Sequence, residues 1–293
     1  MGSSLGRLEV VRHRGGGNSR ARGHNRAVTE QIGVSRSRPA AVLLVAFAAA
    51  ACQHRPVADP TAAQPSFAVT VRLARLGVAR HRSVELWIAR PLAEPQRPLV
   101  LHLTGDSGRH GFDLLLFTAL TRWGYPVAIL GSQAWANTLP DRVATPRALA
   151  ADLDLLGRAA ARAVGLTKDR PFVLLGQSRG AGLAVEAASE PTLSPRLLGV
   201  VALGLCPEEE LVHRGHHAGR PYRDKDLLGA LPLEVIQSTH DRYMDAAAAR
   251  AAFGPDREHQ RLHAVEARSH TFAGNREALL DQLRDSLERI IGR

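Results

Sequence analysis

The chain has 293 residues, 45% of them hydrophobic, and a formal net charge of +10. This length and hydrophobic content are enough for one large core, so a second domain is not required. Residues 1–55 hold nine arginines against two glutamates, which places seven of the ten net positive charges there. The remainder has no basic stripe with interleaved aromatic residues, which argues against nucleic acid as a partner. The two cysteines, Cys52 and Cys206, exclude a disulfide framework.

Residues 1–33 are rich in glycine, arginine, serine and asparagine and have no apolar periodicity. We interpret this segment as disordered or as an over-extended gene start, with the true start near Val34. Residues 34–52 have the pattern of a lipoprotein-type signal peptide, in which two arginines precede an apolar run from Pro39 that stops at Cys52. The run is shorter than the ~20 residues that span a bilayer and matches the apolar part of a secretory signal.

The end of this run resembles the lipobox of bacterial lipoproteins. In that pattern the cysteine, here Cys52, is lipidated and becomes the first mature residue, although Ala49 stands where an aliphatic residue such as leucine is usual. Ordinary cleavage after an Ala-x-Ala pattern is the alternative. We therefore expect an exported, periplasmic protein that a lipid anchor holds at the membrane, with the proline-rich residues 53–65 as a tether.

We expect one folded domain over residues 66–293. Residues 67–73 and 83–89 alternate apolar and polar side chains, which predicts two antiparallel strands joined through Gly77. Residues 99–103 form a short and almost wholly apolar run. Such a run is typical of a strand that is buried on both faces of a sheet.

Beyond this strand, helices and strands alternate along the chain. Thr145 and Pro146 predict the start of a helix that continues to residue 164. The other expected helices cover residues 112–123, the small residues after 178, 245–252 and 276–291, and the other expected strands cover 126–130, 172–175, 197–205, 232–237 and 261–266. Residues 206–230 are expected to be irregular. This alternation predicts an α/β fold with a mostly parallel central sheet and helices on both faces. The antiparallel N-terminal strand pair before this sheet, together with a serine turn at residues 176–180 after its third apolar strand, gives the order of elements found in α/β-hydrolases.

The pattern G-x-S-x-G at residues 176–180 lies between an apolar strand and a helix-like segment. In this context Gly176 and Gly180 lack the Cβ atoms that would collide where the chain reverses. Ser178 can then stand exposed at the edge of a sheet as a nucleophile. The pattern alone is weak evidence, because glycine and serine are common in ordinary loops, so the prediction depends on partners elsewhere in the chain.

Two later strands supply those partners. Asp241 and His270 each follow a predicted strand by a few residues, so the chain order is Ser, Asp, His, as in α/β-hydrolases. We predict Ser178 as the nucleophile, His270 as general base and then acid, and Asp241 as the carboxylate that orients the imidazole. Taken singly, Asp241 could cap a helix, His270 could be a loop residue, and His240 could replace either of them. The joint order favours the triad.

A tetrahedral intermediate also needs donors for its oxyanion. We expect the amide of Arg179, which follows the nucleophile, and the amide of Asp106, in the glycine-rich loop after the first buried strand. The alternative is that this loop is only a turn.

Other polar and aromatic residues have more ordinary interpretations. The histidines of the H-x-x-H-H cluster at residues 213–217 lack a carboxylate or cysteine that would complete a zinc site, so we expect no metal and no cofactor. Cys206 ends a strand that points towards the site, but a small buried hydrophobe is its usual role. Tyr125 and Trp135 either line the pocket or pack in the core.

Several segments carry a resemblance to a known family. They are T-G-D-S-G at 104–108, G-Y-P-V at 124–127, A-T-P with A-D-L at 144–146 and 151–153, G-Q-S-R-G-A at 176–181, and H-T-F-A-G at 270–274. Through them, residues 98–291 resemble the bacterial virulence-associated AcvB/VirJ serine hydrolases, a family of α/β-hydrolases. The resemblance implies a periplasmic enzyme that acts on aminoacylated phosphatidylglycerol.

The sequence departs from that family around the serine. Gln177 and Arg179 replace its flanking aromatic residues, and Gly182 replaces an acidic residue. If that acidic residue holds a cationic aminoacyl group, its absence leaves the aminoacyl specificity open. The side chain of Arg179 favours an anionic substrate feature such as a phosphate, with a solvent-facing arginine as the alternative.

We therefore expect an exported serine hydrolase that cleaves a carboxylic or aminoacyl ester, including that of a phospholipid, through an acyl-serine intermediate. Two alternatives remain: an acyltransferase with the same triad, and a non-catalytic binding lipoprotein with the same fold. The intact order of Ser178, Asp241 and His270 argues against the binding protein.

Overall fold

The computed structural model describes residues 10–13, 67–73, 82–90, 97–138, 145–190, 193, 195–209, 220–221 and 230–292. All of these belong to one of the two units into which the chain divides. The expected signal peptide with Cys52, the tether and the histidine cluster at 213–217 lie outside the described residues. Within the described ranges, no helix is both long enough and apolar enough to cross a membrane.

The centre of the fold is one large sheet. Its strands are β1 (Val10–His13), β2 (Phe67–Leu73), β3 (Arg82–Ala89), β4 (Leu99–Leu103), β5 (Val127–Leu130), β6 (Phe172–Gln177), β7 (Leu197–Leu203), β10 (Leu233–Ser238) and β11 (Gln260–Val265). In the described part of the chain their order is β1-β2-β3-β5-β4-β6-β7-β10-β11. The six strands from β5 to β11 are parallel, whereas β1, β2 and β3 pair antiparallel.

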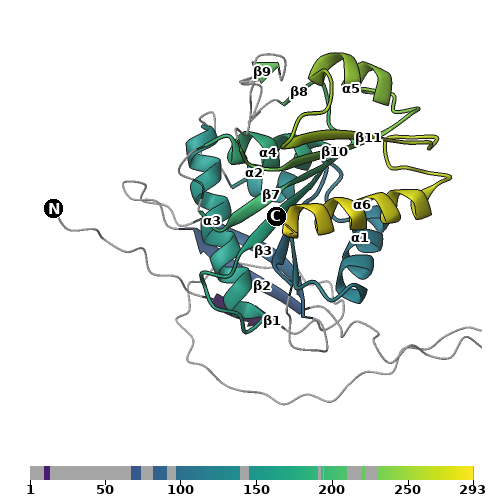
Figure 1. The fold of residues 1–293 in the computed structure, drawn as a ribbon. Coiled ribbons are helices and arrows are strands. Elements are labelled where there is room, and N and C mark those ends of the chain that lie inside the picture. The colour runs from purple at the N-terminus through teal and green to yellow at the C-terminus, as the bar shows by residue number, and fades with distance from the viewer. Residues whose placement is uncertain are drawn as a thin grey trace, which may run out of the picture. The chain divides into compact units, whose positions relative to one another are not determined.

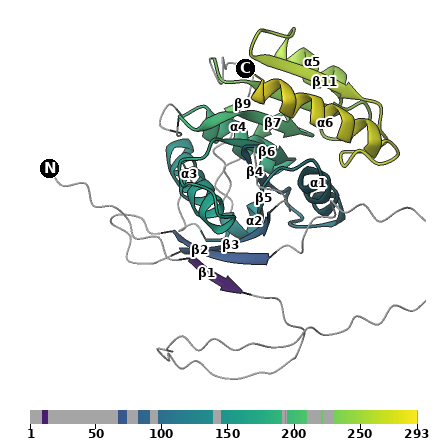
Figure 2. The same cartoon turned by 60° about the horizontal axis from the view of Figure 1, so that its bottom comes forward.

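Helices cover both faces of this sheet. They are α1 (Gly111–Arg122), α2 (Ser132–Ala136), α3 (Pro146–Ala163), α4 (Arg179–Ala188), α5 (Ala246–Phe253) and α6 (Arg276–Ile291). Buried side chains of α3, α4 and α5 belong to one apolar cluster and those of α1 and α6 to another. Figures 1 and 2 show α3 on one side of the strands and α1 on the other.

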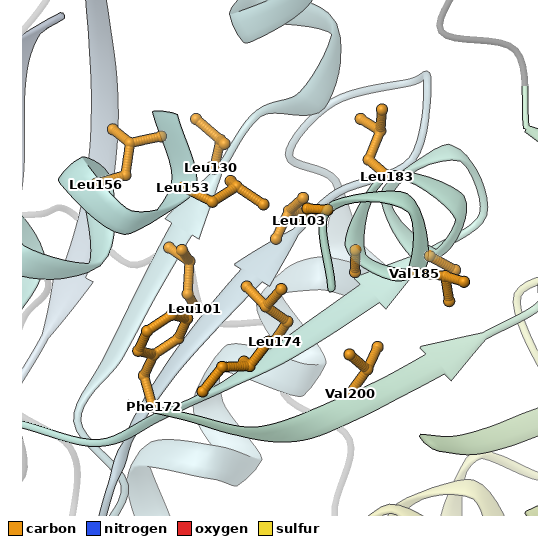
Figure 3. Close-up of a cluster of buried hydrophobic side chains, with 14 of the residues drawn as sticks. Leu101, Leu103, Leu130, Leu153, Leu156, Phe172, Leu174, Leu183, Val185 and Val200 are labelled. Atoms are coloured by element: carbon orange, nitrogen blue, oxygen red, sulfur yellow. The ribbon is translucent and has the colours of Figure 1, made fainter. Parts of the chain in front are cut away.

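The alternation of side chains along each strand divides the core into these two layers. Leu101 and Leu103 of β4 point into the layer beneath α3 and α4. Val100, which precedes Leu101 on the same strand, points into the opposite layer. Figure 3 shows the first of these layers, in which Leu174 of β6 lies among leucines from the neighbouring strands and helices. Each fully buried leucine contributes about 1.5–3 kcal/mol through the removal of apolar surface from water.

Local capping signals start the helices where the sequence predicts. The hydroxyl of Thr145 accepts a hydrogen bond from the amide of Ala148 at 3.2 Å, and Pro146 occupies the first position of α3. This satisfies one of the amides that a helix start leaves without an intrahelical partner. Asp245 caps α5 in the same way, through the amide of Ala248 at 2.7 Å.

The observed fold confirms the predicted α/β class, the parallel sheet and the antiparallel pair formed by β2 and β3. Four short elements were not expected. Strand β1 lies inside residues 1–33, where we expected no regular structure, and α2 lies between the expected strand at 126–130 and the expected helix from Thr145. Residues 206–230 contain the two-residue strands β8 (Glu208–Glu209) and β9 (Arg220–Pro221). Each is too short for hydrophobic periodicity to predict.

Candidate active site

Ser178 lies in the tight turn between β6 and α4. Its φ is 53° and its ψ is −122°, and its amide donates to the carbonyl oxygen of Leu203 on the neighbouring strand β7 at 2.9 Å. A positive φ is rare for a residue with a side chain and costs about 1–3 kcal/mol, so the surrounding structure must hold this conformation. Strain of this kind is typical of a nucleophile that a strand-to-helix turn presents.

The two glycines of the motif are required by close backbone contacts. A Cβ atom on Gly176 would lie 2.2 Å from the carbonyl oxygen of Gly180. A Cβ atom on Gly180 would lie 2.1 Å from the carbonyl oxygen of Leu103, at the end of β4. Neither position leaves room for a side chain, so the G-x-S-x-G pattern follows from packing of α4 against β4 and β6.

Asp241 and His270 form a hydrogen-bonded pair beyond the ends of β10 and β11. The distance between Nδ1 of His270 and Oδ2 of Asp241 is 2.6 Å, and the side chain of Asp241 is fully buried. A carboxylate accepts hydrogen bonds and does not donate them, so Nδ1 carries the proton. In the neutral ring Nε2 is then the basic nitrogen.

Two further donors hold the carboxylate of Asp241. The amide of Tyr243 donates to Oδ1 at 2.9 Å, and Nε2 of Gln237 donates to Oδ2 at 3.3 Å. Gln237 is itself buried and also bonds both backbone groups of Leu205, which follows β7. The carboxylate is therefore positioned from two strands of the sheet.

Ser178 and His270 line the same pocket, which has a volume of about 510 Å³. Nε2 of His270 is buried and has no hydrogen-bond partner among the described residues. The bond between the serine and the histidine is therefore not formed in this structure. Long or open nucleophile–base contacts are common before substrate binds, and they shorten in the complex.

The loop after β4 lies directly against the nucleophile. A Cβ atom on Gly105 would be 2.4 Å from Oε1 of Gln177 and 3.2 Å from Cβ of Ser178. Asp106 lines the pocket, and its carboxylate forms an ion pair with the guanidinium of Arg179. This ion pair connects the two residues whose amides we predict as oxyanion donors. Within the described ranges, neither amide donates to another backbone or side-chain acceptor.

A buried histidine beneath this loop was missed by the sequence analysis. His102 on β4 is fully buried, with Nε2 2.9 Å from Oδ1 of Asp113 on α1 and Nδ1 3.2 Å from the carbonyl oxygen of Leu175. The other oxygen of Asp113 accepts the amide of His110 at 3.1 Å. The pair therefore fixes the start of α1 against β4. Its only signal in the sequence is one polar residue inside an apolar strand.

Tyr243 was also missed, because its position beside the histidine depends on the loop conformation. Its ring contacts the imidazole of His270 edge-on, with the ring centroids 4.8 Å apart. Tyr243 is 51% exposed and lines the pocket. His240 lines the pocket as well, but its Nδ1 bonds Thr239 and the carbonyl oxygen of Ala267. His240 makes no contact with Asp241 that would let it replace His270.

The remaining candidates have structural surroundings. Tyr125 is buried and accepts a hydrogen bond from Arg97 at 2.7 Å, and Trp135 is buried and donates to Asp152 at 3.1 Å. Both pack in the core instead of lining the pocket. Cys206 is partly buried. Among the described residues, no group of histidine, cysteine and acidic side chains is suited to hold a metal ion.

No family model matches this chain, and no curated protein matches it in sequence. Solved structures do match. Est1E from Butyrivibrio proteoclasticus is 11% identical with a TM-score of 0.54, and the alignment covers 80% of this chain and all of that one. The Pyrococcus furiosus esterase Pf2001 is 13% identical with a TM-score of 0.52, over 78% of this chain and 90% of that one. At such identities the likeness concerns the fold.

Proposed function

We propose that this chain, which has the α/β-hydrolase fold, is a serine hydrolase that cleaves carboxylic esters through an acyl-serine intermediate. The observation that carries the proposal is the pairing of Asp241 with His270 at 2.6 Å in a pocket that Ser178 also lines. The basic Nε2 of His270 has no other partner among the described residues, so it is available to a nucleophile. The esterase structures of the same fold support this reading.

Acylation begins when Nε2 of His270 removes the proton of Ser178 as Oγ attacks the ester carbonyl. The new Oγ–C bond converts the carbonyl oxygen into an oxyanion, to which the amides of Asp106 and Arg179 donate. Collapse of this intermediate breaks the C–O bond of the ester. The leaving alcohol takes the proton from His270, and the acyl group stays on Ser178.

Deacylation repeats these steps with water. His270 removes a proton from water, the resulting hydroxide adds to the acyl carbon, and the same two amides stabilise the oxyanion. Breakage of the bond to Oγ releases the acid, and Ser178 recovers its proton from His270. The carboxylate of Asp241 stabilises the imidazolium that forms in each half of the reaction.

The finer assignment rests on the sequence resemblance to the AcvB/VirJ family. It supports an exported enzyme, anchored through Cys52, that acts on a carboxylic or aminoacyl ester of a phospholipid. Gly182 lies on α4 and offers no acidic group for a cationic aminoacyl moiety. Among phospholipid esters, one without a cationic aminoacyl group is therefore as good a candidate substrate as an aminoacylated one.

Labelling with a fluorophosphonate probe tests the proposal, because the probe reacts with an activated serine. We expect labelling of the wild-type chain and hydrolysis of para-nitrophenyl acetate, and loss of both in Ser178→Ala and His270→Ala. Ser189→Ala, at the end of α4 and outside the pocket, is the matched serine control and should be labelled normally. Absence of labelling and of hydrolysis in a folded wild-type chain would falsify the proposed enzymatic activity. The alternative of a non-catalytic binding protein would then remain. Transfer of the acyl group to an added alcohol, in preference to water, would indicate the acyltransferase.

A further inference from the structure

The side chain of Arg179, for which the sequence left open an anionic substrate feature or solvent, has a partner within the protein. Its guanidinium is paired with the carboxylate of Asp106. Two other arginines, Arg242 and Arg268, line the pocket with Ser178 and His270. They come from the loops after β10 and β11, which also carry Asp241 and His270.

Arg242 is held in place by the side chain of the neighbouring Tyr243. Its guanidinium carbon lies 4.7 Å from the ring centroid of Tyr243, and Nη2 donates to the phenol oxygen at 2.6 Å. A guanidinium has five N–H donors, so the remaining donors are available to an acceptor. No carboxylate pairs with Arg242 within the described ranges. The aromatic contact therefore pre-orients a cation whose charge is not neutralised.

Arg268 is held by packing of its aliphatic stem. Its Cγ, Cδ and Nε atoms lie 3.3 Å from the position that a Cβ atom on Gly274 would occupy. Gly274 has a φ of 90°, and the turn around it is closed by the hydrogen bond from the amide of Arg268 to the carbonyl oxygen of Ala273 at 2.9 Å. The stem thus lies over a glycine of the histidine loop. Within the described residues, no carboxylate pairs with this guanidinium.

The carboxylates of the pocket do not balance these charges. Its described lining includes Asp106 and Asp113. Asp106 is paired with Arg179, and Asp113 is bonded to His102 at 2.9 Å. The side of the pocket formed by the loops after β10 and β11 therefore presents two arginines, beside the catalytic imidazole, whose charges no lining carboxylate offsets.

We propose that Arg242 and Arg268 form an anion subsite, and that the substrate is an ester whose acyl or alcohol part carries a carboxylate or phosphate. This inference rests on the proposed ester hydrolysis and defines its substrate class. Guanidinium groups suit both anions, because paired N–H donors match paired oxygens. The exposed side chain of Tyr243 contacts both Arg242 and the imidazole of His270 and so connects Arg242 to the catalytic base.

Paired esters that differ in one charge test the subsite in the full chain. The para-nitrophenyl monoester of adipic acid is compared with para-nitrophenyl hexanoate, and acetylglycerol phosphate with acetylglycerol. We expect kcat/KM to be about tenfold or more higher for at least one anionic member than for its neutral partner, and added salt to reduce this ratio. The pair with the larger ratio identifies carboxylate or phosphate as the preferred anion.

Substitution of the arginines assigns the preference to them. Arg242→Gln and Arg268→Gln should each lower the anionic-to-neutral ratio of kcat/KM by about tenfold. Arg242→Lys and Arg268→Lys keep the charge and should retain part of the ratio. Arg276→Gln, an exposed arginine at the start of α6 outside the pocket lining, is the matched control and should leave the ratio unchanged. Thermal melts check that each variant is folded.

The outcomes separate this inference from the function on which it rests. Hydrolysis of the neutral esters with no preference for anions overturns the subsite and leaves the hydrolase intact. Equal loss of activity towards both members of a pair in the glutamine variants also overturns it, because a structural role lowers both. Absence of hydrolysis and of Ser178 labelling overturns the proposed function, and the subsite with it.

Discussion

Arg179 and Asp106 form an ion pair that joins the residue after the nucleophile to the loop after β4. These are the two residues whose backbone amides we assign to the oxyanion hole. The ion pair joins side chains, so substitution of either side chain leaves both backbone amides present as donors. The pair therefore stabilises the relative position of two donors that lie 73 residues apart in the sequence.

Asp106→Asn and Arg179→Gln should each lower kcat for a neutral ester by about two- to fivefold. The reason is that a partly exposed ion pair contributes about 0.2–1 kcal/mol, while both amides remain. The double variant should lose no more activity than either single variant, because all three proteins lack the same Asp106–Arg179 ion pair. Steady-state kinetics of the four proteins form a double-mutant cycle, and strictly additive losses would contradict a coupling between these side chains.

Gly180→Ala should destabilise the fold by about 3 kcal/mol or more, because its Cβ atom would lie 2.1 Å from the carbonyl oxygen of Leu103. Gly111→Ala at the start of α1 is the control, since a Cβ atom there meets nothing within 4 Å. Urea denaturation measures both. A Gly180→Ala protein as stable as the control would show that α4 does not pack against β4 as described.

Asp241→Asn should reduce kcat by about 10³- to 10⁴-fold with a much smaller change in KM. The amide cannot stabilise the imidazolium, and it favours the wrong tautomer of His270 when its NH₂ group faces Nδ1. The pH dependence of kcat separates this loss of catalysis from unfolding. The difference in kcat between wild type and variant should become smaller at high pH, where hydroxide can replace the general base. A loss below tenfold would assign the orienting role to another residue.

Gln237→Leu should lower both stability and activity. The substitution leaves the amide and the carbonyl oxygen of Leu205 without their buried partners and removes one donor from Asp241. Unsatisfied buried groups cost about 1–3 kcal/mol each. Gln237→Glu keeps the acceptor but places a second carboxylate beside Asp241. Compared with Gln237→Leu, it should therefore lower kcat more and the melting temperature less. Equal effects of the two variants on kcat would contradict a positioning role.

Asp154 on α3 makes stability depend on pH away from the site. Burial alone raises the pKa of Asp154, but hydrogen bonds and charges from Arg158 and Arg196 outweigh burial and hold the pKa below its usual range. A carboxyl group whose pKa is lowered by folding stabilises the protein above its unfolded pKa, ~3.9, and this contribution is lost as pH falls through the folded value.

Wild type should therefore lose stability below about pH 4, and Asp154→Asn should remove that part of the dependence. At pH 7 the variant should be less stable by about 1–3 kcal/mol, because two guanidinium groups lose their charged acceptor. Urea denaturation between pH 3 and pH 7 measures both effects. Parallel stability curves for wild type and variant would show that Asp154 does not contribute to the pH dependence.

Most helices and strands, and the chain order of the candidate triad, could be predicted from the sequence alone. Strand and helix periodicities repeat every few residues, so they are readable without tertiary structure. Ser178, Asp241 and His270 could be selected because each follows a strand, and parallel strands end at the same edge of a sheet.

Which side chains meet across loops could be read only from the folded chain. Arg179, whose charge the sequence suggested for a substrate, pairs with Asp106. Arg242 and Arg268 contact an aromatic ring and a glycine turn instead, and no carboxylate pairs with them among the described residues. Contacts of this kind depend on loop conformations and on packing between distant segments, and no local pattern encodes them. The fold class followed from periodicity, whereas the charge of the pocket followed from which ion pairs the packing allows.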